Sequence, residues 1–179
     1  MTKLLPALVL LAACATTAPP AAAPPQWTNV PAPILNAFCA RLRGEGVARD
    51  SQILVLKTTQ PLITASSMDA LGQAFFKRGN SVMMSEALNA VLKPLPLTIP
   101  TSGSCTWQPI DAVNPRRDHE RIILELSTPF VNPYSKGESG LFARMSVGGQ
   151  APEWFWIPVA ERNGEWAIGM VLPMELHEE

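Results

Sequence analysis

The side chains best suited to chemistry in this sequence are two histidines, three cysteines and fifteen acidic residues. His119 and His177 lie far apart, and no close set of His and Cys follows a zinc-binding pattern, so we expect neither a metal site nor a cofactor. Asp118 stands beside His119, which suggests acid–base chemistry near neutral pH. Adjacent strand residues point to opposite faces, however, and the favoured interpretation is a solvated turn after Asn114-Pro115.

Signatures of nucleophilic or phosphate chemistry are missing from the sequence. It contains no G-x-S-x-G, no S-x-x-K, no Walker loop and no G-x-G-x-x-G. The segment Gly137-Glu138-Ser139-Gly140 has the wrong spacing for a nucleophile elbow. The sequence therefore favours a domain that is not an enzyme, although it leaves open a pair of carboxylates that only the fold brings together.

The first cysteine, Cys14, follows a short leader with one basic residue, Lys3, and an apolar run over residues 4–13. Such a run is typical of a secretory signal and is shorter than the about 20 residues of a membrane-spanning helix. The end of the leader, Leu11-Ala12-Ala13-Cys14, resembles the lipobox of bacterial lipoproteins. The resemblance implies that residues 1–13 are cleaved, that the Cys14 thiol receives a diacylglycerol and that the new amine is acylated. The alternative is an ordinary signal peptide with an incidental cysteine.

Residues 15–26 read ATTAPPAAAPPQ, without a charge or a large apolar side chain. Such a segment cannot bury enough surface to fold, and twelve extended residues would span about 37 Å. Residues 14–26 are therefore expected to form a lipidated tether, with a proline-rich ligand as the minor alternative. Ala15 replaces the aspartate that resembles an inner-membrane retention signal. The resemblance thus implies a lipid anchor in the bacterial outer membrane, with the domain in the periplasm.

The other two cysteines, Cys39 and Cys105, are left to pair if Cys14 carries lipid, because exported proteins meet an oxidising compartment. The alternatives are a catalytic thiol, which lacks a recognisable nucleophile motif here, and two free buried cysteines.

Charge gives no sign of a nucleic-acid or lipid-binding surface. Apolar residues make up 47% of the chain and charged residues 16%. Without Lys3, thirteen of the fourteen basic residues remain against fifteen acidic ones, a formal charge of −2. We therefore expect no nucleic-acid partner and no polybasic membrane patch.

The first half of residues 27–179 is expected to be mainly helical. Pro31 and Pro33 fit the first turn of a helix that ends at Gly44. Ser66 or Ser67 is expected to cap a second helix, and a third is expected over residues 81–93. Apolar residues recur at helical spacing in all three: Ile34, Leu35, Phe38 and Leu42, then Met68, Leu71 and Phe75, then Met84, Leu88, Val91 and Leu92.

The second half is expected to form short strands, in addition to an earlier buried strand over residues 52–58. Asn163-Gly164 predicts a hairpin that pairs Arg162 with Glu165. Counting outward predicts one bulky face, made of Phe155, Ile157, Val159, Ile168, Met170 and Leu172. It predicts a second face on which Trp156 opposes Val171 and Pro158 opposes Gly169, with Trp154 further out.

Three aromatic residues are candidates for binding. Trp154 and Trp156 lie over small residues and could line a pocket or an interface, and Tyr134 lies in the long loop over residues 128–139. Core packing of the tryptophans is the favoured alternative, because aromatic residues usually serve the core.

These elements predict one α+β domain over residues 27–179, with N-terminal helices packed on one face of a C-terminal antiparallel meander that ends in the hairpin. The layout resembles the cone-shaped fold shared by nuclear transport factor and ketosteroid isomerase. The resemblance is architectural, covers about the last 110 residues and carries no shared motif, so no site residues are transferred.

Two functions fit these predictions. The first is an envelope lipoprotein whose domain is a non-catalytic binding or structural module for an envelope protein or glycan. The second is a small-molecule-binding or enzymatic domain with a pocket between helices and sheet. An enclosed cavity lined by Trp154, Trp156 and converging polar groups would favour the second, whereas a filled interior with an exposed apolar patch would favour the first.

The lipid anchor can be tested with Cys14→Ser. The variant lacks the thiol that would accept the diacylglycerol, so we expect it to be released from washed membranes, as measured by fractionation. A variant that stays bound to the membranes would contradict the anchor.

Overall fold

The structure is a computed structural model that describes residues 27–47, 51–75, 80–118, 120–135, 137–148, 150–162 and 165–176. The predicted signal peptide, Cys14 and the tether lie outside these residues, as do both histidines and the predicted turn Asn163-Gly164. None of the helices in the described ranges is long and apolar enough to cross a membrane.

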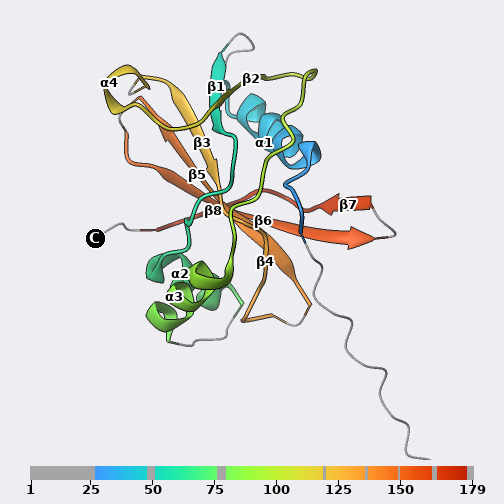
Figure 1. Cartoon of the computed structure of the whole chain (residues 1–179), viewed down its shortest axis with the longest axis vertical. Helices are drawn as coiled ribbons and strands as arrows, with labels where there is room; N and C mark the ends of the chain where they lie inside the picture. The colour runs from blue at the N-terminus through green and yellow to red at the C-terminus, as the bar shows by residue number, and fades with distance from the viewer. Residues whose placement is uncertain are drawn as a thin grey trace, which may run out of the picture.

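A curled, mostly antiparallel sheet forms the centre of the fold, and the described residues give it eight strands (Figure 1). The strand order is β2-β1-β3-β5-β6-β7, while β4 pairs with β5 and β8 pairs with β6. The strands are β1 (Gln52–Leu56), β2 (Thr106–Ile110), β3 (Ile122–Leu126), β4 (Phe130–Val131), β5 (Ser139–Val147), β6 (Glu153–Arg162), β7 (Glu165–Ile168) and β8 (Leu172–Met174).

The α+β class is confirmed, but the sheet is mixed. β1 runs parallel to both of its neighbours, β2 and β3, and all other pairs are antiparallel. Parallel strands need a long crossover, and the chain between β1 and β2 supplies one that contains α2 and α3. The apolar pattern of β1 predicts a buried strand but carries no information on the direction of its neighbours.

The helices begin at the polar or proline residues that precede their apolar runs. Pro33 lies in the first turn of the first helix, as predicted, whereas Pro31 is the residue just before it. The second helix is capped by Thr64 and not by the predicted serines alone: the Thr64 hydroxyl accepts from the Ser67 N–H at 3.0 Å, and the Ser67 hydroxyl accepts from the Thr64 N–H at 2.9 Å. The helices are α1 (Ala32–Gly44), α2 (Ala65–Ala74), α3 (Ser81–Val91) and α4 (Pro115–Asp118).

Helices cover both faces of the sheet, which differs from the predicted single helical layer. Figure 1 shows α1 near β1 and β2, and α2 with α3 at the other end of the view. Successive strand residues point to opposite faces, so β5 and β6 contribute to two core clusters, one on each face. The first joins α1 to residues including Ile53, Val55, Leu141, Ala143, Phe155 and Ile157. The second joins Met68 and Leu71 of α2 to Phe142, Trp154 and Trp156.

The predicted register between β6 and β7 is confirmed only up to Ile168. Val159 pairs with Ile168, and the Gly169 N–H donates to the Pro158 carbonyl oxygen at 2.8 Å. Beyond this point Trp156 pairs with Leu172 and not with Val171, because the chain between β7 and β8 contains one residue more than a continuous strand needs. A shift of one residue exchanges the faces.

This one-residue shift changes which apolar side chains are buried between β7 and β8. Val171 joins the core beneath α1, whereas Met170, predicted to lie on the bulky face, is 77% exposed. Leu172 is also exposed. The prediction that six residues share one bulky face is therefore wrong for Met170 and Leu172.

A disulfide joins Cys39 of α1 to Cys105 just before β2, with an S–S distance of 2.11 Å, as predicted. The two cysteines are 66 residues apart in the sequence, and closing such a loop contributes about 4 kcal/mol on the chain-entropy model. The bond ties α1 to the β2 edge of the sheet.

The contact between Gly140 and Trp156 can be tested with Gly140→Ala. A Cβ at position 140 would overlap the Trp156 ring and lie 2.7 Å from the Ile157 carbonyl oxygen, so both strands must shift. We expect a loss of about 1–3 kcal/mol in the free energy of unfolding, measured with urea. The control is Gly44→Ala, which would meet nothing within 4 Å. Equal losses in the two variants would contradict the close packing.

Candidate functional site

The predicted binding residues Trp154, Trp156 and Tyr134 lie in the core. Their exposed fractions are 3%, 2% and 4%, and all three belong to the cluster beneath α2. The Trp156 ring packs against Phe142 and Phe130, with ring centroids 5.2 and 5.5 Å apart. This arrangement matches the core-packing alternative, and none of the three lines either of the cavities described below.

Asp118, the candidate for acid–base chemistry, is a buried carboxylate that organises the turn around α4. Its Oδ2 accepts from the Asn114 N–H at 2.8 Å, and its Oδ1 accepts from Arg117 Nε at 2.9 Å. The hydrogen bond from Arg117, followed by that from the Asn114 backbone, holds the pKa of Asp118 below its usual range. The predicted solvated turn is thus correct for Arg116 and Arg117 and wrong for Asp118, which is buried.

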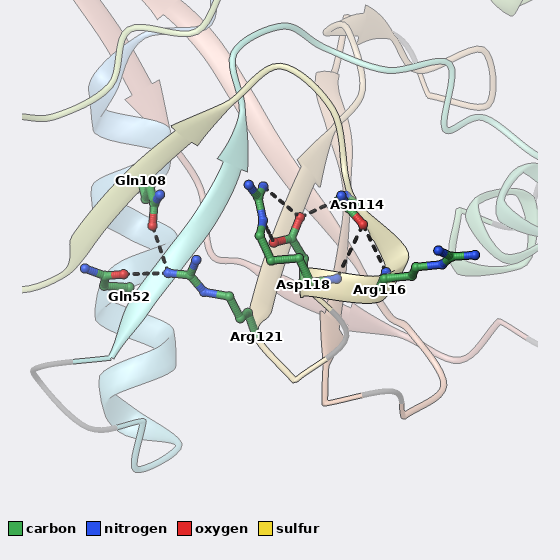
Figure 2. A network of polar contacts seen from close by, with 7 residues as sticks. Gln52, Gln108, Asn114, Arg116, Asp118 and Arg121 are labelled. Carbon is green, nitrogen blue, oxygen red and sulfur yellow. Dashed lines mark hydrogen bonds and ion pairs between the residues drawn. The ribbon is translucent and has the colours of Figure 1, made fainter.

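The same charged stretch also ties three strands together. Figure 2 shows the Arg121 guanidinium between two amide side chains. It donates to Oε1 of Gln52 at the start of β1, and to Oε1 of Gln108 in β2 at 2.8 Å. These bonds have a structural role, since they join the beginnings of β1 and β3 to β2.

No group of three or more His, Cys, Asp or Glu in the described part of the chain is placed to hold a metal ion.

An apolar hollow of about 580 Å³ lies over the small residues of β6 and β7. Its floor contains Pro158 and Ala160 of β6 with Ala167 and Gly169, which alternate onto the same face as Trp156. The remaining lining residues are Phe75 at the end of α2, Gly137, Glu138 and Ser139 before and in β5, Val159, Ile168 and Leu172.

The hollow is open to solvent. Glu138, Ala167, Gly169 and Leu172 are all exposed, so its floor is part of the protein surface. Among the described lining residues, Glu138 has the only ionisable side chain and Ser139 the only hydroxyl. The arrangement can bind an apolar group, and it presents no pair of titratable side chains for proton transfer.

The sequence predicts part of this site. The pairing of Pro158 with Gly169 and the space over these small residues follow from the register. The positions of Phe75 and Leu172 in the hollow do not follow from the predicted register. Phe75 comes from a helix predicted to lie elsewhere, and Leu172 reaches the hollow only through the shifted register. The exposed Met170, two residues before Leu172, adds to the apolar surface at the end of β7.

A second, smaller cavity of about 200 Å³ lies beside a chain of hydroxyl hydrogen bonds. The Leu95 N–H donates to Thr59 Oγ1 at 2.8 Å, and Thr128 Oγ1 donates to the Lys93 carbonyl oxygen at 2.8 Å. The two hydroxyls are 2.6 Å apart, so Thr59 donates to Thr128. Both hydroxyl protons are donated to acceptors within the protein. These hydrogen bonds join the chain after α3 to the residues that follow β1 and β3, beside the cavity.

A third surface is the outer face of α3, which is also apolar. Val82, Met83 and Val91 are exposed, at 53%, 66% and 71%, and Ala87 and Ala90 lie exposed between them. The inner face of the same helix contributes Met84, Leu88 and the following Leu92 to the core under α2.

Comparison with family models, with curated proteins and with solved structures finds no match for this chain.

The role of Asp118 predicts how stability depends on pH. A carboxyl whose pKa is lowered in the folded state stabilises the fold above its unfolded pKa of about 4, and this stability is lost as the pH falls through the folded pKa. Asp118→Asn should therefore lower the urea midpoint at pH 7, and the difference from the parent protein should shrink at pH 3.

The matched control is Asp111→Asn, because the Asp111 side chain is 85% exposed. This variant should change the urea midpoint little at either pH. A difference for Asp118→Asn that is the same at pH 7 and pH 3 would contradict the assigned pKa direction.

Proposed function

We propose that the protein is a lipid-anchored envelope protein whose periplasmic domain is a non-catalytic binding module, and that the apolar hollow receives its partner. The observation that carries this proposal is an open apolar hollow lined by exposed Leu172, in a domain where Trp154 and Trp156 fill the core. Exposed apolar patches of this kind mark binding surfaces in soluble domains.

Two features support the envelope location. The sequence places the lipobox-like Leu11-Ala12-Ala13-Cys14 before a charge-free tether. The Cys39–Cys105 disulfide is of the kind that persists in oxidising compartments such as the periplasm.

The tether ends at Trp27, which stacks on Trp166 of β7 with ring centroids 4.3 Å apart. The predicted anchor therefore leaves the domain beside the strand that lines the hollow.

A small apolar ligand is the second candidate for the hollow. A volume of about 580 Å³ falls within the range of small-molecule sites. The open floor favours a macromolecule, because small ligands usually bury most of their surface in a concave site.

The two candidates can be separated by placing a photoreactive amino acid at Ala167 in intact cells. Ala167 is exposed in the hollow, so we expect crosslinking to one defined protein or glycan, identified by mass spectrometry. The control position is Ala112, which is exposed between β2 and α4 and does not line the hollow. Ala167→Trp, which fills the hollow, should compete with the partner and reduce its recovery by pull-down about tenfold or more.

A different pair of results would contradict the proposed binding of a macromolecule. Failure to capture any macromolecule from Ala167, together with a defined small molecule in the purified protein, would contradict the proposed binding module and favour the second candidate.

A further inference from the structure

The outer face of α3 is mostly apolar, and its residues belong neither to the hollow nor to the core. α3 (Ser81–Val91) contains one charged residue, Glu86, and buries only Ser85 fully. Contiguous apolar residues on the exposed side of a helix mark a surface that another molecule covers. Its inner face packs beneath α2, whereas Val82, Met83, Ala87, Ala90 and Val91 remain exposed.

Three of these exposed residues form one continuous stripe. Met83, Ala87 and Val91 are spaced four residues apart and therefore lie one above the other along the helix. Eleven residues give a helix of about 16 Å, so the stripe is long enough to lie flat on a surface. Figure 1 shows α3 at the periphery of the fold, away from α1.

We propose that this α3 face rests on the lipid surface to which the chain is anchored, an inference that depends on the anchor in the proposed function. The length of chain outside the described residues selects this occupant. Residues 15–26 separate the predicted lipid on Cys14 from Trp27 and reach about 37 Å when extended. A domain of this size has a radius of gyration of about 15 Å, so any of its faces can turn to the membrane.

The tether also favours lipid over a soluble partner as the molecule that contacts the α3 face. Linked sites meet at an effective concentration in the millimolar range, so a face with only weak affinity for lipid becomes occupied once the chain is anchored. Interfacial helices bury their apolar side about 5–10 Å into the boundary between headgroups and acyl chains. The stripe of Met83, Ala87 and Val91 suits that depth. Glu86 lies on the neighbouring ridge of the same exposed side, between Val82 and Ala90, and its carboxylate would stay among the lipid headgroups.

The experiment uses the lipidated chain in vesicles of phosphatidylethanolamine and phosphatidylglycerol that contain brominated acyl chains. A fluorescent amino acid replaces Met83 in one sample and Met170 in the other, since both methionines are highly exposed. Bromine quenches only probes within the bilayer boundary. We expect at least about twofold stronger quenching at position 83 than at position 170.

A second pair of variants tests the face without altering the core. Val91→Glu places a charge in the stripe and should weaken the lipid contact about tenfold, seen as loss of quenching at position 83. Val131→Glu, an exposed valine of β4, is the matched control and should leave the quenching unchanged.

Sedimentation of the chain with the vesicles separates the two ways of failing. A chain that does not sediment has no working anchor, and both the proposed function and this inference fail. A chain that sediments with equal quenching at positions 83 and 170 overturns the α3 contact alone. Equal quenching together with a concentration-dependent dimer would assign the stripe to a second copy of the chain and would also overturn the lipid contact.

Discussion

Burial of both faces of β5 and β6 is the constraint on which the rest of the fold depends. Phe142 and Trp156 point to one side, and Ala143 and Phe155 to the other. Each side needs an apolar cover, so α1 packs on one and α2 on the other. The Cys39–Cys105 bond ties α1 to the β2 edge, while the hydroxyl chain through Thr59 and Thr128 joins the end of α3 to the sheet.

The hollow exists because α2 covers only part of its face of the sheet. α2 stops at Ala74, and beyond it the same face of β6 and β7 carries Pro158, Ala160, Ala167 and Gly169. Small side chains cannot fill the space that Trp154 and Trp156 fill further along β6. The tryptophans thus complete the core, and the proposed partner site is the unfilled continuation of the same face.

The most charged segment of the chain has a structural role in the described residues. Asp118 accepts from Asn114 and Arg117, and Arg121 bridges Gln52 and Gln108. The Asp118 bonds order the turn around α4, and the Arg121 bonds join the chain before β3 to β1 and β2. The surfaces left for interaction are apolar, namely the hollow and the α3 stripe, which is consistent with a chain whose charged fraction is low.

The sequence by itself determined α1, α2, α3, β1, the strand-rich second half and the β6–β7 register as far as Ile168, because apolar period and turn chemistry are local properties. It also predicted the disulfide pair from the number of cysteines, whereas β4 and α4 form where a loop and a turn were predicted. The proposed anchor at Cys14 also comes from the sequence alone. Tertiary structure decided the parallel pairing of β1, the split of the helices between two faces, the burial of Asp118 and the place of Leu172 in the hollow. Each of these depends on which distant segments meet, and a single residue between β7 and β8 exchanges the faces of everything after it.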